Sequence, residues 1–219
     1  MLQLKTSGSQ AIEMATKLPR ADSPVRLKLM VAAKQCLLRD GFAALSTRAV
    51  AEEAETQLSQ IHYHFGSKHG LILALLEHQN EALLARQSQM FGAETPLSLR
   101  WLQSCDFLEE DLRSGFVRVL QEIIAGGYSD LGLAAAAREV LKGWFILLNS
   151  LAAEIKDLQG VRPGLPADQL ACLIGLAFLG AESMILINTE LPVIASLRSV
   201  GALLASLEMS QMGGPNDAR

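Results

Sequence analysis

The chain has 219 residues, half of them hydrophobic and 5% aromatic, and a formal net charge of −4. This length leaves room for a buried core in one large or two small domains. Leu and Ala dominate the apolar residues and alternating runs of Val, Ile and Thr are missing, so the composition predicts an all-α protein. The three cysteines are far apart and odd in number, which excludes a disulfide framework and favours reduced thiols in a cytoplasmic protein.

Charge is distributed unevenly along the chain. Residues 1–70 hold nine Lys or Arg against six Asp or Glu, a net of +3, whereas the rest hold ten against seventeen, a net of −7. The overall negative charge argues against a nucleic-acid-binding protein. A basic N-terminal part on an acidic body is instead the asymmetry expected of a local DNA-binding module.

The first predicted helix follows a polar segment. Residues 1–22 show little periodicity and are expected to form a flexible arm. Ser23 and Pro24 are residue types that open a helix, and Gly41 is the type that ends one. Between them the apolar residues repeat at helical spacing, which predicts a helix with one buried face.

Two short helices and a long one are predicted next. Ser46 caps the segment TRAVAEEA, and the turn Glu55-Thr56-Gln57 leads into a third helix over Leu58–His64. Phe65-Gly66 breaks that helix, and Ser67 caps a fourth that runs toward Phe91. Three short helices with a tight turn between the second and third predict a helix-turn-helix domain over 23–68.

The rest of the chain is predicted to be a helical body over 69–210. Helices are expected at about 97–113, 115–126, 130–158, 167–188 and 191–209, with a linker at 92–96 and a loop at 161–166. The tail, 211–219, is expected to be disordered.

The stretch 170–188 is almost wholly apolar and approaches the roughly 20 residues that a membrane span needs. Glu182 lies inside it, Asp168 precedes it, and no basic or aromatic anchors flank it. We therefore expect no membrane partner. A helix buried in a core or in a subunit interface fits better.

The third helix of the helix-turn-helix is the element expected to enter the major groove of DNA. Ile61 is its inward anchor. The side chains expected to face outward, toward bases or phosphates, are Gln57, Ser59, Gln60, His62 and Tyr63. From spacing alone, the polar face of a short solvated helix remains an equal alternative.

The segment from Arg26 to Leu76 resembles the DNA-binding domain of the tetracycline-repressor (TetR) family. The resemblance is carried by Arg26, Leu29, Ala33, Gly41-Phe42, Ser46, Val50-Ala51, Ala54 and the run IHYHFGSKHGLI from Ile61 to Ile72. The Tyr-His-Phe-x-x-Lys segment is its most specific part, because it joins the recognition helix to the fourth helix in that family. The match covers about 50 residues, and the remaining 150 agree only in length and helical layout.

The resemblance implies further DNA contacts. Tyr63, His64 and Lys68 fall where family members contact the DNA backbone. Ser46 and Thr47 are implied phosphate contacts, which Arg48 could join. Glu55 replaces the usual turn Gly and His62 the usual Tyr, which puts the detailed contacts in doubt but not the fold.

The resemblance also implies a ligand pocket and a homodimer in the body. Aromatic, sulfur and polar residues suited to a mostly apolar effector are Trp101, Cys105, Phe116, Trp144, Phe145, Asn149, Phe178 and Glu182. Candidate dimer contacts on the last two helices are Leu173, Leu176, Gly180 and Leu197. Ordinary core packing is the alternative for both sets.

The carboxylate of Glu182 in an apolar helix requires a partner. A cationic ligand, Arg138 or Arg198 could supply it.

No metal site, cofactor or enzyme motif is expected. His62 and His64 point to different sides of a helix, and no phosphate-binding Gly-rich loop or activated nucleophile is found. The sequence thus predicts a ligand-responsive transcriptional regulator of a pseudo-palindromic operator, with repression the expected mode. An activator, and a helical ligand-binding protein whose DNA reader has degenerated, remain open alternatives.

Overall fold

The structure is a computed structural model that describes residues 23–91, 95–157 and 166–212. Over these residues the protein contains nine α-helices and no β-strand, as the sequence predicts. The helices are α2 (Pro24–Ala44), α3 (Thr47–Glu53), α4 (Leu58–Phe65), α5 (Lys68–Phe91), α6 (Leu97–Ser114), α7 (Phe116–Gly126), α8 (Leu131–Asp157), α9 (Ala167–Leu186) and α10 (Val193–Met212). The predicted arm, 1–22, lies outside the described residues, as do positions 213–219 of the predicted tail.

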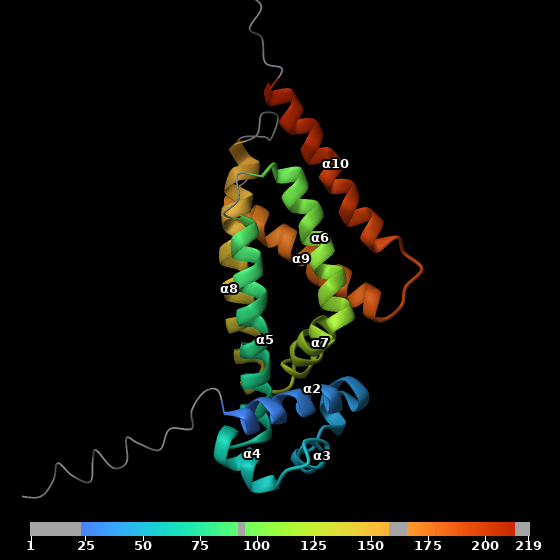
Figure 1. Ribbon diagram of the computed structural model, residues 1–219. Coiled ribbons are helices and arrows are strands. Elements are labelled where there is room, and N and C mark those ends of the chain that lie inside the picture. The colour runs from blue at the N-terminus through green and yellow to red at the C-terminus, as the bar shows by residue number, and fades with distance from the viewer. Residues whose placement is uncertain (1–22, 92–94, 158–165, 213–219) are drawn as a thin grey trace, which may run out of the picture.

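Helices α2, α3 and α4 form a small unit at one end of an elongated molecule (Figure 1). The Ser23 hydroxyl accepts a hydrogen bond from the Arg26 amide (3.2 Å), and Pro24 occupies the first turn of α2. Gly41 adopts φ 76°, which interrupts the helix and turns the chain toward α3. The predicted apolar face of α2 is fully buried, as Leu29 and Leu37 show.

The turn between α3 and α4 keeps a left-handed residue without glycine. Glu55 has φ 46°, a conformation that side chains with a Cβ rarely adopt. Its carboxylate pairs with Lys28 Nζ on α2 at 3.3 Å. The departure noted in the sequence therefore leaves the turn in place, with the backbone strain located at one exposed residue.

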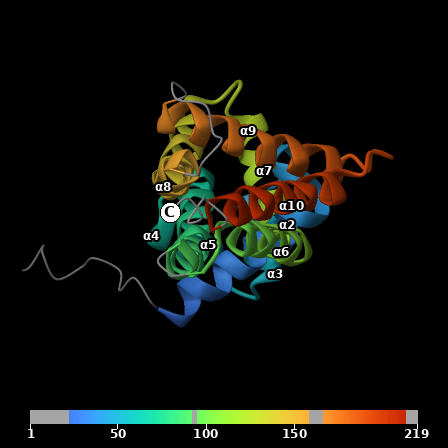
Figure 2. The same cartoon turned by 90° about the horizontal axis from the view of Figure 1, so that it is seen from above.

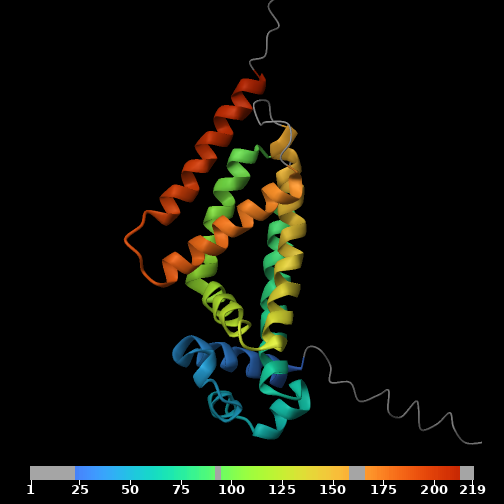
Figure 3. The ribbon, with the colours of Figure 1, turned by 180° about the vertical axis from the view of Figure 1, so that it is seen from behind.

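Helix α5 connects this unit to the body and runs beside α8 in both side views (Figures 1 and 3). Its first half packs into a core cluster that also includes residues of α2, α7 and α8. Leu71, Ile72 and Leu76 are almost completely buried there. A single apolar core thus joins the N-terminal unit to the helices behind it.

A second core cluster holds α6, α8, α9 and α10 together. The indole of Trp101 on α6 donates a hydrogen bond to the Leu197 carbonyl on α10 (2.7 Å). Arg100, also on α6, is buried and forms a bidentate pair with Glu154 on α8. Seen along the long axis, α9 runs along one edge of the body and α10 lies between α9 and α6 (Figure 2).

Two helices are long and apolar enough, by length and composition, to cross a membrane: Ala167–Leu186, with mean hydropathy 1.8, and residues 193–210, with mean hydropathy 1.3. Core helices of soluble proteins pass the same test. Part of α9 belongs to the second core cluster, where Phe178 and Ala181 are buried. Cys172 is exposed on the same helix, whereas Cys36 and Cys105 are buried.

Candidate nucleic-acid interface and ligand cavity

Helix α4 has one buried side and one polar, exposed side. Ile61 is fully buried and anchors the helix against α2 and α5. Among the residues expected to face outward, Gln60 is half-buried and the others are exposed: Gln57, Ser59, His62 and Tyr63. This surface presents amides, hydroxyls and a phenol, which are groups that hydrogen-bond base edges and phosphates.

The start of α3 lies in the same small unit. The Ser46 hydroxyl accepts a hydrogen bond from the Ala49 amide at 3.1 Å and caps the helix, as predicted. Thr47 is half-buried and Arg48 is exposed. Arg48 takes part in none of the salt bridges found in the described part of the chain, whereas Arg39 is held by Asp40 and Glu53.

The joint between α4 and α5 places Lys68 against α2. Its ammonium donates to the Phe42 carbonyl (2.9 Å) and lies 4.3 Å from the centroid of the Phe42 ring. Burial lowers the pKa of Lys68. Lys68 thus joins α5 to α2, and the phosphate contact that the resemblance implies for it stays a prediction.

His64 is half-buried beside Tyr63, with ring centroids 4.9 Å apart. Burial, and then the charge of Arg26, lower the pKa of the His64 imidazole. Its Nδ1 atom is buried and has no hydrogen-bond partner among the described residues. A neutral imidazole carries a single N–H, so it can donate to a phosphate from only one of its ring nitrogens.

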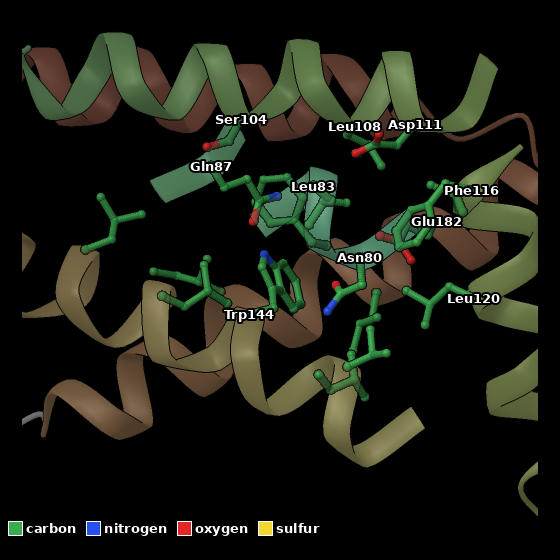
Figure 4. A pocket seen from close by; sticks show the side chains of 18 of the residues that line it. Asn80, Leu83, Gln87, Ser104, Leu108, Asp111, Phe116, Leu120, Trp144 and Glu182 are labelled. Carbon is green, nitrogen blue, oxygen red and sulfur yellow. The ribbon is translucent and has the colours of Figure 1, made fainter. Parts of the chain in front are cut away.

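A cavity lies in the body between α5, α6, α7, α8 and α9. The volume inside it that is open to the centre of a water molecule is ≈ 60 Å³. Its wall includes the indole of Trp144 and the polar side chains of Asn80, Gln87, Asp111 and Glu182, which surround the same space in Figure 4. The remaining wall is mostly apolar, which suits a hydrophobic ligand with a few polar groups.

Glu182 projects from α9 and is only 8% exposed. Gln121 Nε2 donates a hydrogen bond to Glu182 Oε2 (2.7 Å), and Ser183 Oγ donates to Gln121 Oε1 (2.9 Å). Burial raises the pKa of Glu182 to about 7, and the Gln121 hydrogen bond opposes that rise. The partner is thus Gln121, and Arg198 pairs with acids on α6 instead.

Five of the eight predicted ligand residues line the cavity: Trp101, Phe116, Trp144, Phe178 and Glu182. Cys105 is buried in the second core cluster and Phe145 packs against it, neither on the cavity wall. Asn149 is exposed on α8. The sequence reasoning missed the wall supplied by α5, where Asn80, Leu83 and Gln87 recur at helical spacing.

Helix α7 links the cavity to the N-terminal unit. Gln121 contacts Glu182 at the cavity, and the next residue, Glu122, accepts a hydrogen bond from the Phe42 amide at 3.2 Å. Arg118 also donates to Glu122 at 3.2 Å. Two successive residues of α7 therefore contact the two regions: Gln121 contacts the cavity wall and Glu122 contacts the end of α2.

The outer face of α9 is apolar and exposed. Leu173 and Leu176 are each 57% exposed. Gly180 is exposed too, with nothing within 4 Å of where a Cβ would stand. Leu197, in contrast, is 8% exposed and belongs to the second core cluster, so its side chain offers little surface to a partner.

The comparisons with known proteins agree with this geometry. The family model of bacterial regulatory proteins, tetR family, matches residues 29–75. No curated protein sequence matches the chain. Among solved structures, the chain is similar to a TetR transcription regulator from Haloarcula marismortui, at 18% identity and TM-score 0.68, over 84% of this chain and 98% of that one.

Two further similar structures contain ligands. One is the transcriptional regulator FadR from Bacillus subtilis in complex with stearoyl-CoA, at 17% identity and TM-score 0.67, over 82% of this chain and 97% of that one. The other is a transcriptional regulator from Saccharomonospora viridis in complex with choline, at 19% identity and TM-score 0.68, over 84% and 97%. At these identities the similarity establishes the fold.

A helix-turn-helix unit and an all-helical body with a cavity lie on the same chain. This is the architecture of a ligand-responsive, DNA-binding transcriptional regulator. Residues 29–75 match the family model of bacterial regulatory proteins, tetR family, and most of the chain shares the fold of a TetR transcription regulator.

Proposed function

We propose that the protein is a homodimeric repressor that binds a pseudo-palindromic operator and releases it when a small, mostly apolar effector fills the cavity. The observation that carries this proposal is the connection through α7. Gln121 contacts Glu182 on the cavity wall, and the adjacent Glu122 contacts Phe42 in the N-terminal helical unit. The ligand complexes of similar regulators, with stearoyl-CoA and with choline, support a small-molecule effector.

Each protomer would place α4 in one major groove. Arg48 and Tyr63 are exposed and are proposed to contact phosphates, together with Ser46, Thr47, His64 and Lys68. Gln60, beside Gln57, Ser59 and His62, is proposed to read bases. The two-fold symmetry of a dimer would match that of the operator.

Effector binding would act by population shift. A ligand that fits the cavity in one arrangement of α7 stabilises that arrangement, and the hydrogen bond that the Phe42 amide donates to Glu122 carries the change to α2. The spacing of the two α4 helices then no longer fits both half-sites. The protein would act in the cytoplasm as a regulator and not as an enzyme.

Selection of duplexes from a random library, followed by fluorescence anisotropy at several salt concentrations, tests DNA binding. Arg48→Ala should weaken binding to all duplexes and lower the salt slope by roughly 0.9, because it removes a cation from a phosphate. Tyr63→Phe removes a neutral donor, so it should weaken binding to all duplexes and leave the salt slope unchanged. Gln60→Ala should instead relax base preference. Lys142→Ala, which removes an exposed charge on α8, is the matched control and should bind as the wild type does.

Salt-independent or absent binding in the wild type would contradict the proposal and favour a ligand-binding protein with a degenerate reader. If Gln60→Ala had the same effects as Arg48→Ala and Tyr63→Phe, the proposed division between base contacts and phosphate contacts would be wrong. An operator occupied only with effector present would favour an activator.

A further inference from the structure

The polar side chains on the cavity wall are two carboxylates, the amides of Asn80 and Gln87 and the hydroxyl of Ser104. Glu182 and Asp111 contribute carboxylates from α9 and α6, and Gln87 contributes an amide from α5. The Gln87 Oε1 atom is buried and has no hydrogen-bond partner among the described residues. A buried acceptor without a donor is costly, so this wall favours a ligand that brings N–H groups.

The two acids differ in how their charge is balanced. Asp111 receives a bidentate pair of hydrogen bonds from Arg86, both at 2.8 Å. Glu182 receives only the neutral Gln121 amide, and no salt bridge among the described residues includes it. An ionised carboxylate that is almost fully buried lacks a counter-charge unless a ligand supplies one.

The rest of the wall suits an apolar, flat body. The rings of Trp101 and Phe178 lie 5.5 Å apart, and those of Trp144 and Phe178 lie 6.3 Å apart in an edge-to-face arrangement. Aromatic faces attract cations as well as hydrocarbon. The cavity therefore combines an aromatic wall with an uncompensated carboxylate (Figure 4).

The geometry points to an effector that is a protonated organic amine, with its ammonium paired to Glu182, an N–H group directed to the Gln87 amide oxygen, and an apolar body among Trp101, Trp144 and Phe178. The inference rests on the proposed function only in calling this molecule an effector. Binding itself requires no DNA.

The charge of Glu182 depends on pH in the empty protein, because burial raises its pKa to about 7. Asp111 is the other titratable group on the wall, and burial raises its pKa as well. Arg86 and Lys34 lie behind Asp111, and the cavity-facing residues of α7 and α8 carry no titratable group. A bound ammonium favours the ionised carboxylate, so its affinity must rise with pH.

Three probes of equal length separate charge from shape: 4-phenylbutylamine, 4-phenyl-1-butanol and 4-phenylbutyrate. Trp101 and Trp144 are the two tryptophans of the chain and both line the cavity, so quenching of their fluorescence reports binding. At pH 8.5 the amine should bind at least about tenfold tighter than the alcohol, in line with a charge-assisted hydrogen bond. The carboxylate should bind weakest.

Substitution Glu182→Gln keeps the shape and removes the charge. It should abolish the preference for the amine and leave binding of the alcohol intact, which also shows that the cavity still folds. Glu190→Gln removes an exposed carboxylate four residues beyond the end of α9 and is the matched control. That control should keep the preference of the wild type.

A pH series on the wild type needs no variant. The affinity for the amine, whose ammonium stays charged like that of lysine, should rise about thirtyfold between pH 5.5 and 8.5, following ionisation of a carboxyl with a pKa of about 7. The affinity for the alcohol should stay constant.

Equal or tighter binding of the alcohol or the carboxylate by the wild type would overturn the inference. So would an unchanged amine preference in Glu182→Gln, or an amine affinity that does not rise with pH. A protein that prefers the amine but binds no DNA would support this inference and overturn the regulator proposal. A protein that binds DNA but does not prefer the amine would overturn the inference and leave the regulator proposal in place.

Discussion

At the scale of a single residue, Glu182 shows how burial couples charge to stability. Its folded pKa of about 7 lies above the ordinary value of 4.5. A raised folded pKa means that the folded protein holds its proton more tightly than the unfolded chain does. The unfolding free energy that this bound proton contributes is fully present below pH 4.5 and is lost as the pH rises through about 7.

We therefore expect the wild type to lose about 3 kcal/mol of unfolding free energy between pH 4.5 and 7.5 relative to Glu182→Gln. The glutamine has no proton to release, so its contribution stays constant over this range. Urea unfolding at several pH values measures the difference. Parallel pH profiles for the wild type and Glu182→Gln would contradict the prediction, and Glu190→Gln should follow the wild type.

Single residues also show where local sequence signals suffice. Ser23, Ser46 and Ser67 each cap a helix by accepting a hydrogen bond from the amide three residues later, at 3.1 to 3.2 Å. A cap depends on neighbours in the chain, so the residue type predicts it. The Gln121 partner of Glu182 is 61 residues away, and no local pattern indicates it.

At the scale of the element, α7 is the helix that connects the two regions. Glu122→Ala removes the acceptor of the Phe42 amide, and we expect a loss of about 1.5–3 kcal/mol in unfolding free energy, as for a hydrogen bond to a charged group. Hydrogen exchange at the Phe42 amide and the end of α2 should become faster. Amide exchange followed by mass spectrometry or NMR measures this.

Arg118→Ala is the control for that experiment, because it removes the other partner of Glu122 and leaves the Phe42 hydrogen bond in place. It should change exchange at Phe42 little. Unaltered exchange at Phe42 in Glu122→Ala would show that the hydrogen bond to Glu122 does not hold the end of α2.

Elements also show what the sequence could not predict of the cavity. Helical periodicity indicates which residues share a face, and it predicted the buried face of α2 and the polar face of α4. It does not say which helix covers which face. Asn80 and Gln87 resemble solvated positions of α5, yet they line the cavity because α6 and α8 pack over them. Asn149, for the opposite reason, is exposed.

At the scale of the whole molecule, the exposed apolar face of α9 is the surface that needs covering. Leu173 and Leu176 are each 57% exposed there, beside the exposed Gly180, and we propose that this face is the interface between the subunits. We expect Leu176→Arg to convert the proposed dimer to a monomer and to weaken operator binding by the loss of one half-site. Sedimentation velocity and anisotropy measure the two effects.

Leu131→Arg provides the matched control, since Leu131 is 88% exposed at the start of α8 and lies outside that face. It should leave the molecular mass in solution unchanged. A Leu176→Arg variant that sediments as the wild type does would place the dimer contact elsewhere.

The contrast between the three cysteines has a practical consequence for the whole assembly. Burial raises the pKa of Cys105 to about 11 and also raises that of Cys36, so these thiols react slowly, whereas Cys172 is exposed on α9. A maleimide should therefore modify one position per chain without any engineered mutation. Cys172 lies one helical turn before Leu176 on the same face of α9, so the proposed dimer should protect this thiol, and its rate of labelling would report dissociation of the dimer.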